Sequence, residues 1–222
     1  MEKRWLTERD KDGYKGFYQL IIKRLIDILI SFLLFPCFVI IAIPISILIK
    51  LEDGGPVFYK AQRIGRDCKK INMYKFRSMK VNSENIVNAD GSTYNSENDP
   101  RVTRVGHWLR KTSLDETAQI INVLIGDLSL IGPRASEWYA LETYKDDEVD
   151  KMKVRPGITG YTQAYYRNSI TVREKRICDA WYAHNVCFFL DVKIFFKTII
   201  TVLKRDNVYT NVVETETKKS NK

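Results

Sequence analysis

The chain has 222 residues, and its 36 lysines and arginines outnumber its 27 aspartates and glutamates, which gives a formal net charge of +9. This surplus suits partners that carry phosphate or anionic lipid. The four cysteines form no Cys-x-x-Cys pair, and the two histidines, His107 and His184, lack metal-ligand spacing. A disulfide framework and a zinc site are therefore excluded.

The first predicted element is the run from Ile28 to Ile49, 22 residues without a charge. At about 1.5 Å per helical residue it is long enough for the roughly 30 Å core of a bilayer. Length alone favours a single transmembrane helix. However, Pro36 and Pro44 lie inside the run, and lysines and arginines flank both ends, as expected when both ends lie on one face of the membrane. We therefore predict a kinked re-entrant helix over residues 23–51, after a polar lead-in over residues 1–22.

The next predicted element is a β-hairpin. Residues 57–59 and 71–79 have strand character, and the second segment alternates apolar and polar side chains. The alternation places Lys75 and Arg77 on one face, which is either a solvated surface or a phosphate-facing pair. Residues 81–100 then form a long polar loop, and loops of that length are usually functional lids or disordered.

Three helical regions follow the loop. Residues 101–111 form a basic amphipathic helix that lies either at the membrane interface or on the protein body. Residues 113–125 form the clearest predicted helix, because Ser113 and Glu116 match a capping box and Gly126 suits a C-cap. Residues 137–153 look like a charged helix.

The last long element is predicted from residue 173 to 205. Its aromatic side chains recur at intervals of three and four, which favours either core packing or burial in the membrane interface. We assign residues 52–208 to one catalytic domain. Residues 209–222 are polar and are predicted to be disordered.

The chemistry centres on the adjacent acids Asp115 and Glu116 in the first turn of a predicted helix, where backbone N–H groups favour phosphate. One carboxylate can attack phosphorus while the other holds Mg²⁺. Acids in a first turn are also common without any catalytic role. Phosphate chemistry gains support from four cations on a predicted strand or tight turns: Lys75, Arg77, Arg134 and Arg155.

Six segments carry a family resemblance, in family order: KRLIDILIS (23–31), LEDGGPVFYKAQRIG (51–65), YKFRSM (74–79), DPRVTRVGHWLRKTSLDETAQIINVLIGDLSLIGPR (99–134), VRPGITGYTQ (154–163) and LDVKIFFKTI (190–199). Together they resemble the bacterial sugar transferases, the small monotopic polyprenyl-phosphate phosphoglycosyl transferases. The resemblance implies an α+β, mainly helical fold with a re-entrant membrane helix, interfacial amphipathic helices and a small β-hairpin.

The same resemblance implies an enzyme that moves a sugar-1-phosphate from a UDP-sugar to undecaprenyl phosphate or another polyprenyl phosphate and releases UMP. It would act at the cytoplasmic face of the bacterial inner membrane, among membrane lipids and downstream glycosyltransferases. The reaction is the first membrane step of exopolysaccharide, O-antigen, capsule or glycoprotein assembly. The sequence does not identify the sugar.

The resemblance also assigns residues. Asp115 falls on the nucleophile that carries a covalent phospho-sugar, and Glu116 falls on the acid that helps to hold Mg²⁺. Arg134 falls on the phosphate-binding arginine and Lys75 on the lysine of a Lys-Phe motif. Asp191 matches a C-terminal acid whose role is less defined.

Two departures from the family pattern concern proline. Ala135 follows Arg134 where the family often has proline, and the membrane run has Pro36 and Pro44 on either side of its midpoint instead of a central Ser-Pro. One alternative function is a non-catalytic membrane-anchored scaffold that binds anionic lipid. A nucleic-acid binder is the other, but the sequence carries no helix-turn-helix, zinc-finger or RNA-recognition signature.

Overall fold

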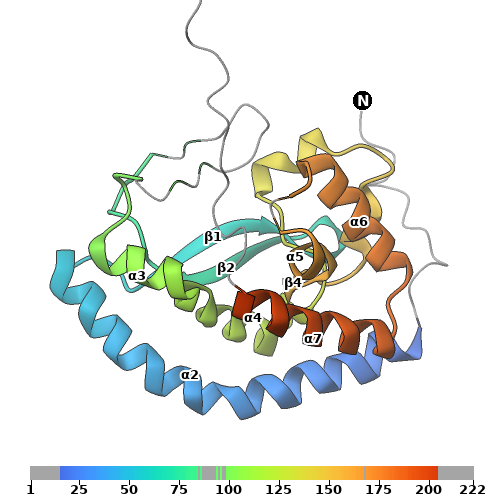
Figure 1. The fold of residues 1–222 in the computed structure, drawn as a ribbon, viewed down its shortest axis with the longest axis horizontal. Helices are drawn as coiled ribbons and strands as arrows, with labels where there is room; N and C mark the ends of the chain where they lie inside the picture. Colours follow the sequence, from blue (N-terminus) through green and yellow to red (C-terminus); the bar gives the residue numbers. More distant parts are fainter. Residues whose placement is uncertain are drawn as a thin grey trace, which may run out of the picture.

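The structure, a computed structural model, describes residues 16–204 except 85, 87–93, 95, 97–98 and 168. Predictions for most of the lead-in, much of the 81–100 loop and the 209–222 tail therefore fall outside the described residues. The described chain is mainly helical with a small antiparallel hairpin, as predicted (Figure 1).

The predicted membrane helix is α2 (Lys23–Asp53), which continues from one turn of π-helix, η1 (Tyr18–Ile22). Pro36 and Pro44 both lie inside it, yet the helix is unbroken. Figure 1 shows it as a smooth bow with its concave side toward the protein body. The predicted kink is therefore not confirmed, since the bend is spread along the helix. Among the described helices, the segment Tyr18–Asp53 alone is long and apolar enough to cross a membrane.

The first turns of α2 are bonded to the protein body. Arg24 donates from Nη1 to the carbonyl of Val123 at 2.6 Å, and the buried carboxylate of Asp27 accepts from the backbone N–H of Leu130 at 3.0 Å. In both bonds a charged side chain pairs with a backbone group, and such hydrogen bonds are stronger than those between neutral groups.

The last turn of α2 is bonded to the same body. Glu52 accepts from the backbone N–H groups of Arg104 at 2.7 Å and Val105 at 3.1 Å, which satisfies free donors at the start of α3 (Arg104–Thr112). Between the two ends, Phe38 and Ile45 are buried in one apolar cluster with the body. Both ends of α2 thus contact one continuous unit.

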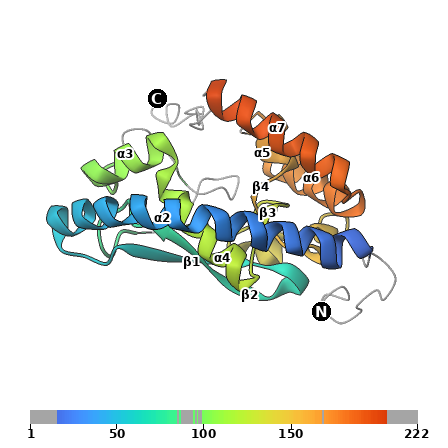
Figure 2. The same ribbon diagram turned by 90° about the horizontal axis from the view of Figure 1, so that it is seen from below.

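The predicted hairpin is confirmed as β1 (Phe58–Ile64) and β2 (Lys70–Phe76), joined through the short 3₁₀ turn η2 (Arg66–Cys68). The strands are antiparallel, and the register runs from Phe58 opposite Phe76 to Ile64 opposite Lys70. Figure 2 shows α2 running across the body, with the hairpin on one side of it and α3 and α7 on the other.

The predicted capping box at Ser113 is wrong. Ser113 adopts a left-handed conformation with φ 58° at the end of α3, and its side chain caps nothing. The expected single helix is instead the 3₁₀-helix η3 (Leu114–Ala118) followed by α4 (Gln119–Ile125). The predicted C-cap is confirmed, because Gly126 has φ 97° and its N–H bonds back to Asn122.

The C-terminal half has more breaks than the sequence predicts. The segment 137–153 forms two 3₁₀-helices, η4 (Trp138–Thr143) and η5 (Val149–Lys153). The predicted element over residues 173–205 is two helices, α6 (Val172–His184) and α7 (Phe188–Lys204), and a short helix, α5 (Tyr161–Tyr165), precedes them. A capping box does occur, at Thr171 and Glu174 before α6. Two short strands, β3 (Ser129–Ile131) and β4 (Gly157–Thr159), pair in parallel.

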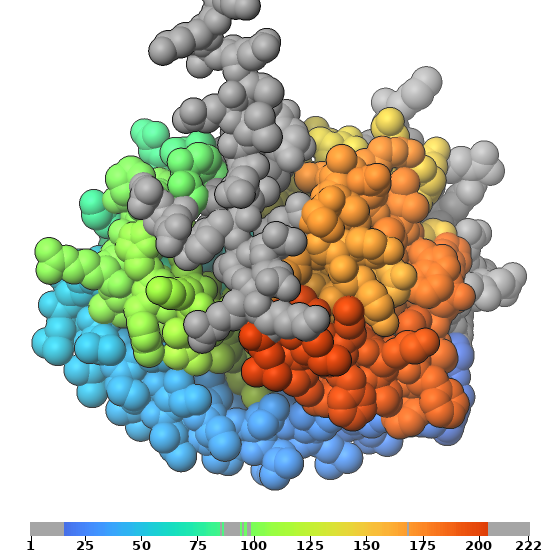
Figure 3. Space-filling model, viewed as in Figure 1, coloured from blue at the N-terminus to red at the C-terminus, as the bar shows by residue number. Residues whose placement is uncertain are grey.

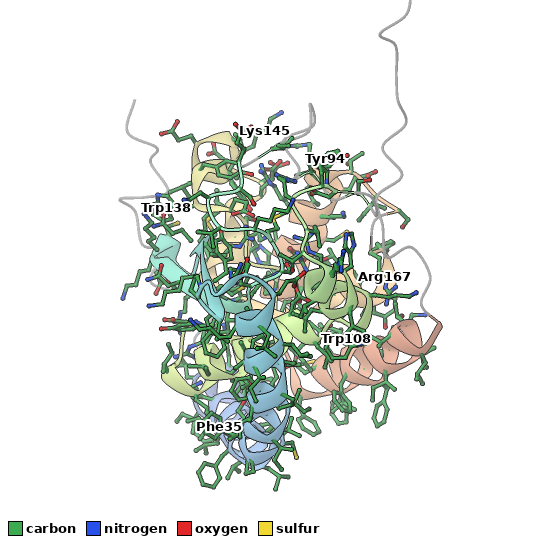
Figure 4. The ribbon with its side chains drawn as sticks, turned by 90° about the vertical axis from the view of Figure 1, so that its left-hand side faces the viewer. Phe35, Tyr94, Trp108, Trp138, Lys145 and Arg167 are labelled. Atoms are coloured by element: carbon green, nitrogen blue, oxygen red, sulfur yellow. The ribbon has the colours of Figure 1, made fainter. Side chains whose placement is uncertain are left out.

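Two helices expose large apolar side chains on one side of the molecule. On α2 these include Phe32 and Leu33, 74% and 75% exposed, and on α7 Phe189 is 81% exposed. In Figure 4 Phe35 lies at the lower end of the view, and Lys145 lies at the opposite end. Figure 3 shows α2 along the whole lower rim of the molecule, next to α7. An apolar surface of this extent marks contact with a membrane or a partner.

Candidate active site

The two acids lie in η3, directly before α4, and two cations from distant parts of the chain meet one of them. Lys75 of β2 donates from Nζ to Oε1 of Glu116 at 2.6 Å. The guanidinium of Arg134 lies 3.9 Å from the same oxygen. The structure therefore brings together Asp115, Glu116, Lys75 and Arg134, as the sequence predicts for a phosphate site.

A buried amide holds the hairpin against this helix. Asn122 of α4 accepts from the backbone N–H of Tyr74 at 2.8 Å and donates to the carbonyl of Asn72 at 2.8 Å. Its side chain is fully buried, so these bonds satisfy groups that would otherwise be costly to bury. The amide fixes β2 beside α4 and thereby sets Lys75 next to Glu116. Sequence reasoning missed Asn122, although a polar residue inside an apolar helical run is a signal of this kind.

Close backbone contact fixes the turn that carries Arg134. The N–H of Gly132 bonds to Thr159, and the N–H of Gly157 bonds to the carbonyl of Pro133 at 2.9 Å. A Cβ atom at Gly157 would lie 2.1 Å from the nitrogen of Gly132, so only glycine permits this approach. The Gly-Pro-Arg turn is thus rigid without a second proline at Ala135. The Arg134 side chain is 58% exposed and free to meet an anion.

The two carboxyl groups differ in their pKa. Burial raises the pKa of Glu116, but Lys75 and then Arg134 outweigh burial and bring this pKa to about 2. Burial also raises the pKa of Asp115, and the charge of Glu116 raises it further, against the opposing effects of Lys75 and Arg110. Pairs of acids whose pKa values are pushed apart commonly take different roles. Glu116 is the permanently charged member, and Asp115 is the less stabilised, more basic one.

A third cation lies beside the Asp115–Glu116 pair, here called the dyad, and it was missed in the sequence. Arg63 of β1 forms an ion pair with Glu137, and its Nε has no hydrogen bond among the described residues. Burial, followed by the nearby charge of Arg134, lowers the Arg63 pKa to about 10. The available signal was the strand period of two, which places Arg63 on the buried face with Ala61.

Arg77 does not join the dyad in this structure. Its guanidinium is buried and forms a bidentate ion pair with Asp53 at the end of α2. It also donates to the carbonyls of Pro56 at 2.6 Å and Met79 at 3.2 Å. These contacts favour a structural role, and phosphate binding by Arg77 stays a prediction that would require it to exchange partners.

Arg155 and Asp191 also lie elsewhere. Arg155 donates from Nε to the carbonyl of Gly126 at 3.0 Å, at the far end of α4 from the dyad. Asp191 of α7 is buried and forms an ion pair with Lys23 at 2.5 Å. It also accepts hydrogen bonds from the hydroxyl groups of Tyr18 and Tyr182 at 2.7 Å and 2.6 Å. These bonds fasten the start of α2 to α7.

The donor set at the dyad fits a Mg²⁺ ion that binds together with phosphate. Among the described residues no cluster of three or more histidine, cysteine, aspartate or glutamate side chains exists. Mg²⁺ in phosphate-transfer sites is usually held by one or two carboxylates plus substrate oxygens, so two adjacent acids suffice. Lys75 bonds to Oε1 of Glu116, and the Gln119 side chain also bonds to this carboxylate, so its remaining acceptor position is the candidate ligand.

Comparison with known protein families identifies the family of the chain. Residues 18–205 match the bacterial sugar transferase family. The chain belongs to that family.

Three relatives are similar over most of this chain. A UDP-galactose-lipid carrier transferase of Erwinia amylovora is 39% identical over 203 residues, and an undecaprenyl-phosphate galactose phosphotransferase of Salmonella typhimurium is 40% identical over 202 residues. Each alignment covers 85% of this chain but 42% of the relative, so the chain spans less than half the length of these two proteins. The exopolysaccharide production protein ExoY of Rhizobium meliloti is 37% identical over 195 residues, which are 81% of this chain and 84% of that protein.

Proposed function

We propose that the protein is a phosphoglycosyl transferase that moves a sugar-1-phosphate from a UDP-sugar to undecaprenyl phosphate and releases UMP. The observation that carries this proposal is the split dyad, in which Glu116 is paired with Lys75 while the adjacent Asp115 has a raised pKa. The names of the relatives, which include galactose and N-acetylgalactosamine phosphotransferases acting on undecaprenyl phosphate, support the substrate class.

The proposed reaction has two displacements at one phosphorus. A carboxylate oxygen of Asp115 attacks the phosphorus that bears the sugar, and the bond from that phosphorus to the bridging oxygen breaks, so that UMP leaves with the electron pair. An oxygen of undecaprenyl phosphate then attacks the same phosphorus. The bond to Asp115 breaks, the carboxylate is restored, and the product is an undecaprenyl-diphosphate sugar. A raised pKa makes Asp115 the better nucleophile of the pair.

The remaining side chains stabilise charge. Arg134, exposed on a rigid turn, is placed to bind the diphosphate, and Lys75 holds the Glu116 carboxylate in position. Mg²⁺ held by Glu116 would neutralise the negative charge that develops on the phosphate oxygens. Arg63 adds positive charge beside Arg134.

We further propose that α2 is re-entrant and that the catalytic body lies on the cytoplasmic face of the inner membrane. The support is that both ends of α2 are bonded to one body, through Asp27 at the start and Glu52 at the end. A helix that crossed the membrane would separate these ends. In a cysteine-free variant, Gly16→Cys and Lys50→Cys should both resist a membrane-impermeant maleimide in spheroplasts and react after lysis. Opposite accessibility would overturn the re-entrant placement.

The proposed activity is tested by UMP release from detergent-purified protein supplied with Mg²⁺, undecaprenyl phosphate and a panel of UDP-sugars. Release with one donor, dependent on the acceptor, is expected, and it names the sugar as well. The alternative, a scaffold that only binds anionic lipid, predicts no release with any donor from folded protein. The same assay after chelation of divalent ions tests the Mg²⁺ proposal separately.

A further inference from the structure

We propose that a hollow beside the first turns of α2 binds the phosphodiester of an anionic phospholipid. The hollow is a shallow, open depression: its enclosed volume is about 10 Å³, and the empty space of about 320 Å³ around it includes open solvent. Its polar lining includes Lys23, Asp27, Arg66, Ser129 and Arg155. This inference rests on the proposed membrane contact of α2 and is independent of the proposed transfer reaction.

The hollow is separate from the dyad. Arg155 binds the carbonyl of Gly126 and Arg24 binds that of Val123, so both cations lie at the C-terminal end of α4. The dyad precedes the N-terminal end of the same helix, whose seven residues (Gln119–Ile125) span about 10 Å at 1.5 Å per residue. An anion in the hollow is therefore distinct from one held by Arg134.

The charged side chains at and near the hollow have a net charge of +1. Lys23, Arg66 and Arg155 line the hollow, and the charge of Arg24 lies close enough to Arg155 to affect its pKa. Three carboxylates oppose them: Asp27, Asp67 and Asp191. A phosphodiester carries a single negative charge and restores the balance. The charged form of Arg155 is destabilised in this arrangement: burial, and then the charges of Arg66 and Arg24, lower its pKa.

Two polar atoms at the hollow lack a hydrogen-bond partner. The Nε of Arg66 is buried without a partner, although the Asp67 carboxylate lies 3.5 Å away. The hydroxyl of Ser129 is 1% exposed, and it makes no well-formed hydrogen bond although it lies beside Asp27. Buried polar atoms in native proteins are usually paired, so two unpaired atoms at one hollow point to a ligand. A phosphate oxygen accepts from both N–H and O–H groups.

The position favours a lipid headgroup as the source of the phosphate. The hollow adjoins Lys23, and on the same turns of helix Ile21 and Leu25 are 47% and 55% exposed. Phe188 and Phe189 at the start of α7 are also exposed. Cations next to exposed apolar side chains match the boundary between acyl chains and headgroups.

The test is a titration of the detergent-purified full chain with dioctanoyl phosphatidylglycerol, followed by native mass spectrometry. We expect the variant Arg66→Gln/Arg155→Gln to bind this lipid at least about fivefold more weakly than the unaltered protein. The control Lys69→Gln/Lys80→Gln removes two charges outside the hollow and should bind normally. Arg66→Lys keeps the charge and should retain most of the binding.

Two further arms identify the source of the phosphate. If inorganic phosphate displaces phosphatidylglycerol, the hollow binds a soluble anion and the lipid proposal is overturned. If undecaprenyl phosphate displaces it and inorganic phosphate does not, the hollow binds the acceptor of the reaction, which also overturns the proposal. Equal binding of phosphatidylglycerol by the double variant and the unaltered protein would overturn the site itself. Circular dichroism confirms folding, and Arg66→Gln alone replaces the double variant if the latter unfolds. UMP release reports on the transfer reaction separately.

Discussion

Lys75 and Glu116 are joined by an ion pair of 2.6 Å that links the β-hairpin to the 3₁₀-helix η3. No salt bridge to the preceding residue, Asp115, occurs among the described residues, and the pKa of Asp115 is raised where that of Glu116 is lowered. Lys75 and Arg134 thus keep Glu116 charged, whereas burial and the charge of Glu116 raise the pKa of Asp115.

Replacement of Lys75 by methionine should reduce kcat/KM for UMP release by about 100-fold or more, because the half-buried Glu116 carboxylate loses its charge-assisted bond. Lys69→Met, an exposed position between the two strands of the hairpin, is the matched control and should stay close to the unaltered protein. Activity of Lys75→Met within about threefold of that control would show that the ion pair has no catalytic importance.

The acid limb of the pH profile should report Asp115. Its carboxylate must be ionised to attack, and its pKa lies above the ordinary value of 3.8, so kcat/KM should fall as the pH drops through this raised value. Glu116, with a pKa of about 2, stays ionised throughout.

The two neighbouring variants should move the acid limb in opposite directions. Lys75→Met removes a charge that lowers the Asp115 pKa, so the limb moves to higher pH, whereas Glu116→Gln removes a charge that raises it, so the limb moves to lower pH. Profiles of the residual activity check the signs. A shift of both variants in the same direction would contradict the assignment of the limb to Asp115.

Arg77→Met should destabilise the fold by roughly 2–4 kcal/mol, because the buried guanidinium pairs with Asp53 and binds two carbonyls. Asp53→Asn should destabilise the fold by a smaller amount, since Asp53 is partly exposed. Denaturant unfolding in detergent measures both. KM for the UDP-sugar should change little in either variant, and a large rise in Arg77→Met alone would instead support the predicted phosphate contact.

Asp191→Asn should lower the thermal unfolding midpoint by about 5 °C or more, because Lys23 would lose its buried counter-charge. The control is Asp146→Asn at an exposed position, which should have little effect. Differential scanning calorimetry in detergent checks the difference. Equal midpoints for the two variants would mean that the bonds of Asp191 do not hold α2 to α7.

The sequence was most informative where structure is local. Apolar–polar alternation predicted the β1–β2 hairpin, the uncharged run predicted α2, and Gly126 predicted the end of a helix. The capping box failed because Glu116 is bonded to Lys75, 41 residues away in sequence, and because Ser113 adopts a left-handed conformation. Neither fact is visible in a four-residue pattern.

The errors in the candidate site have the same origin. Strand alternation placed Arg77 on the face of Lys75, but Asp53, 24 residues earlier, holds its guanidinium. Asn122 was hidden in an apolar run, because only the fold shows which strand its amide meets. Side-chain partners that are distant in sequence depend on tertiary packing, which local periodicity does not encode.

A single-turnover experiment tests the proposed covalent role of Asp115 most directly. The purified protein is incubated with its UDP-sugar and Mg²⁺ without acceptor, and the intact mass and UMP are measured. We predict one sugar-phosphate adduct on the peptide containing Asp115, one UMP for each protein, loss of the adduct when undecaprenyl phosphate is added, and neither product with Asp115→Asn. UMP release by Asp115→Asn, or turnover without any adduct in the unaltered protein, would contradict the mechanism.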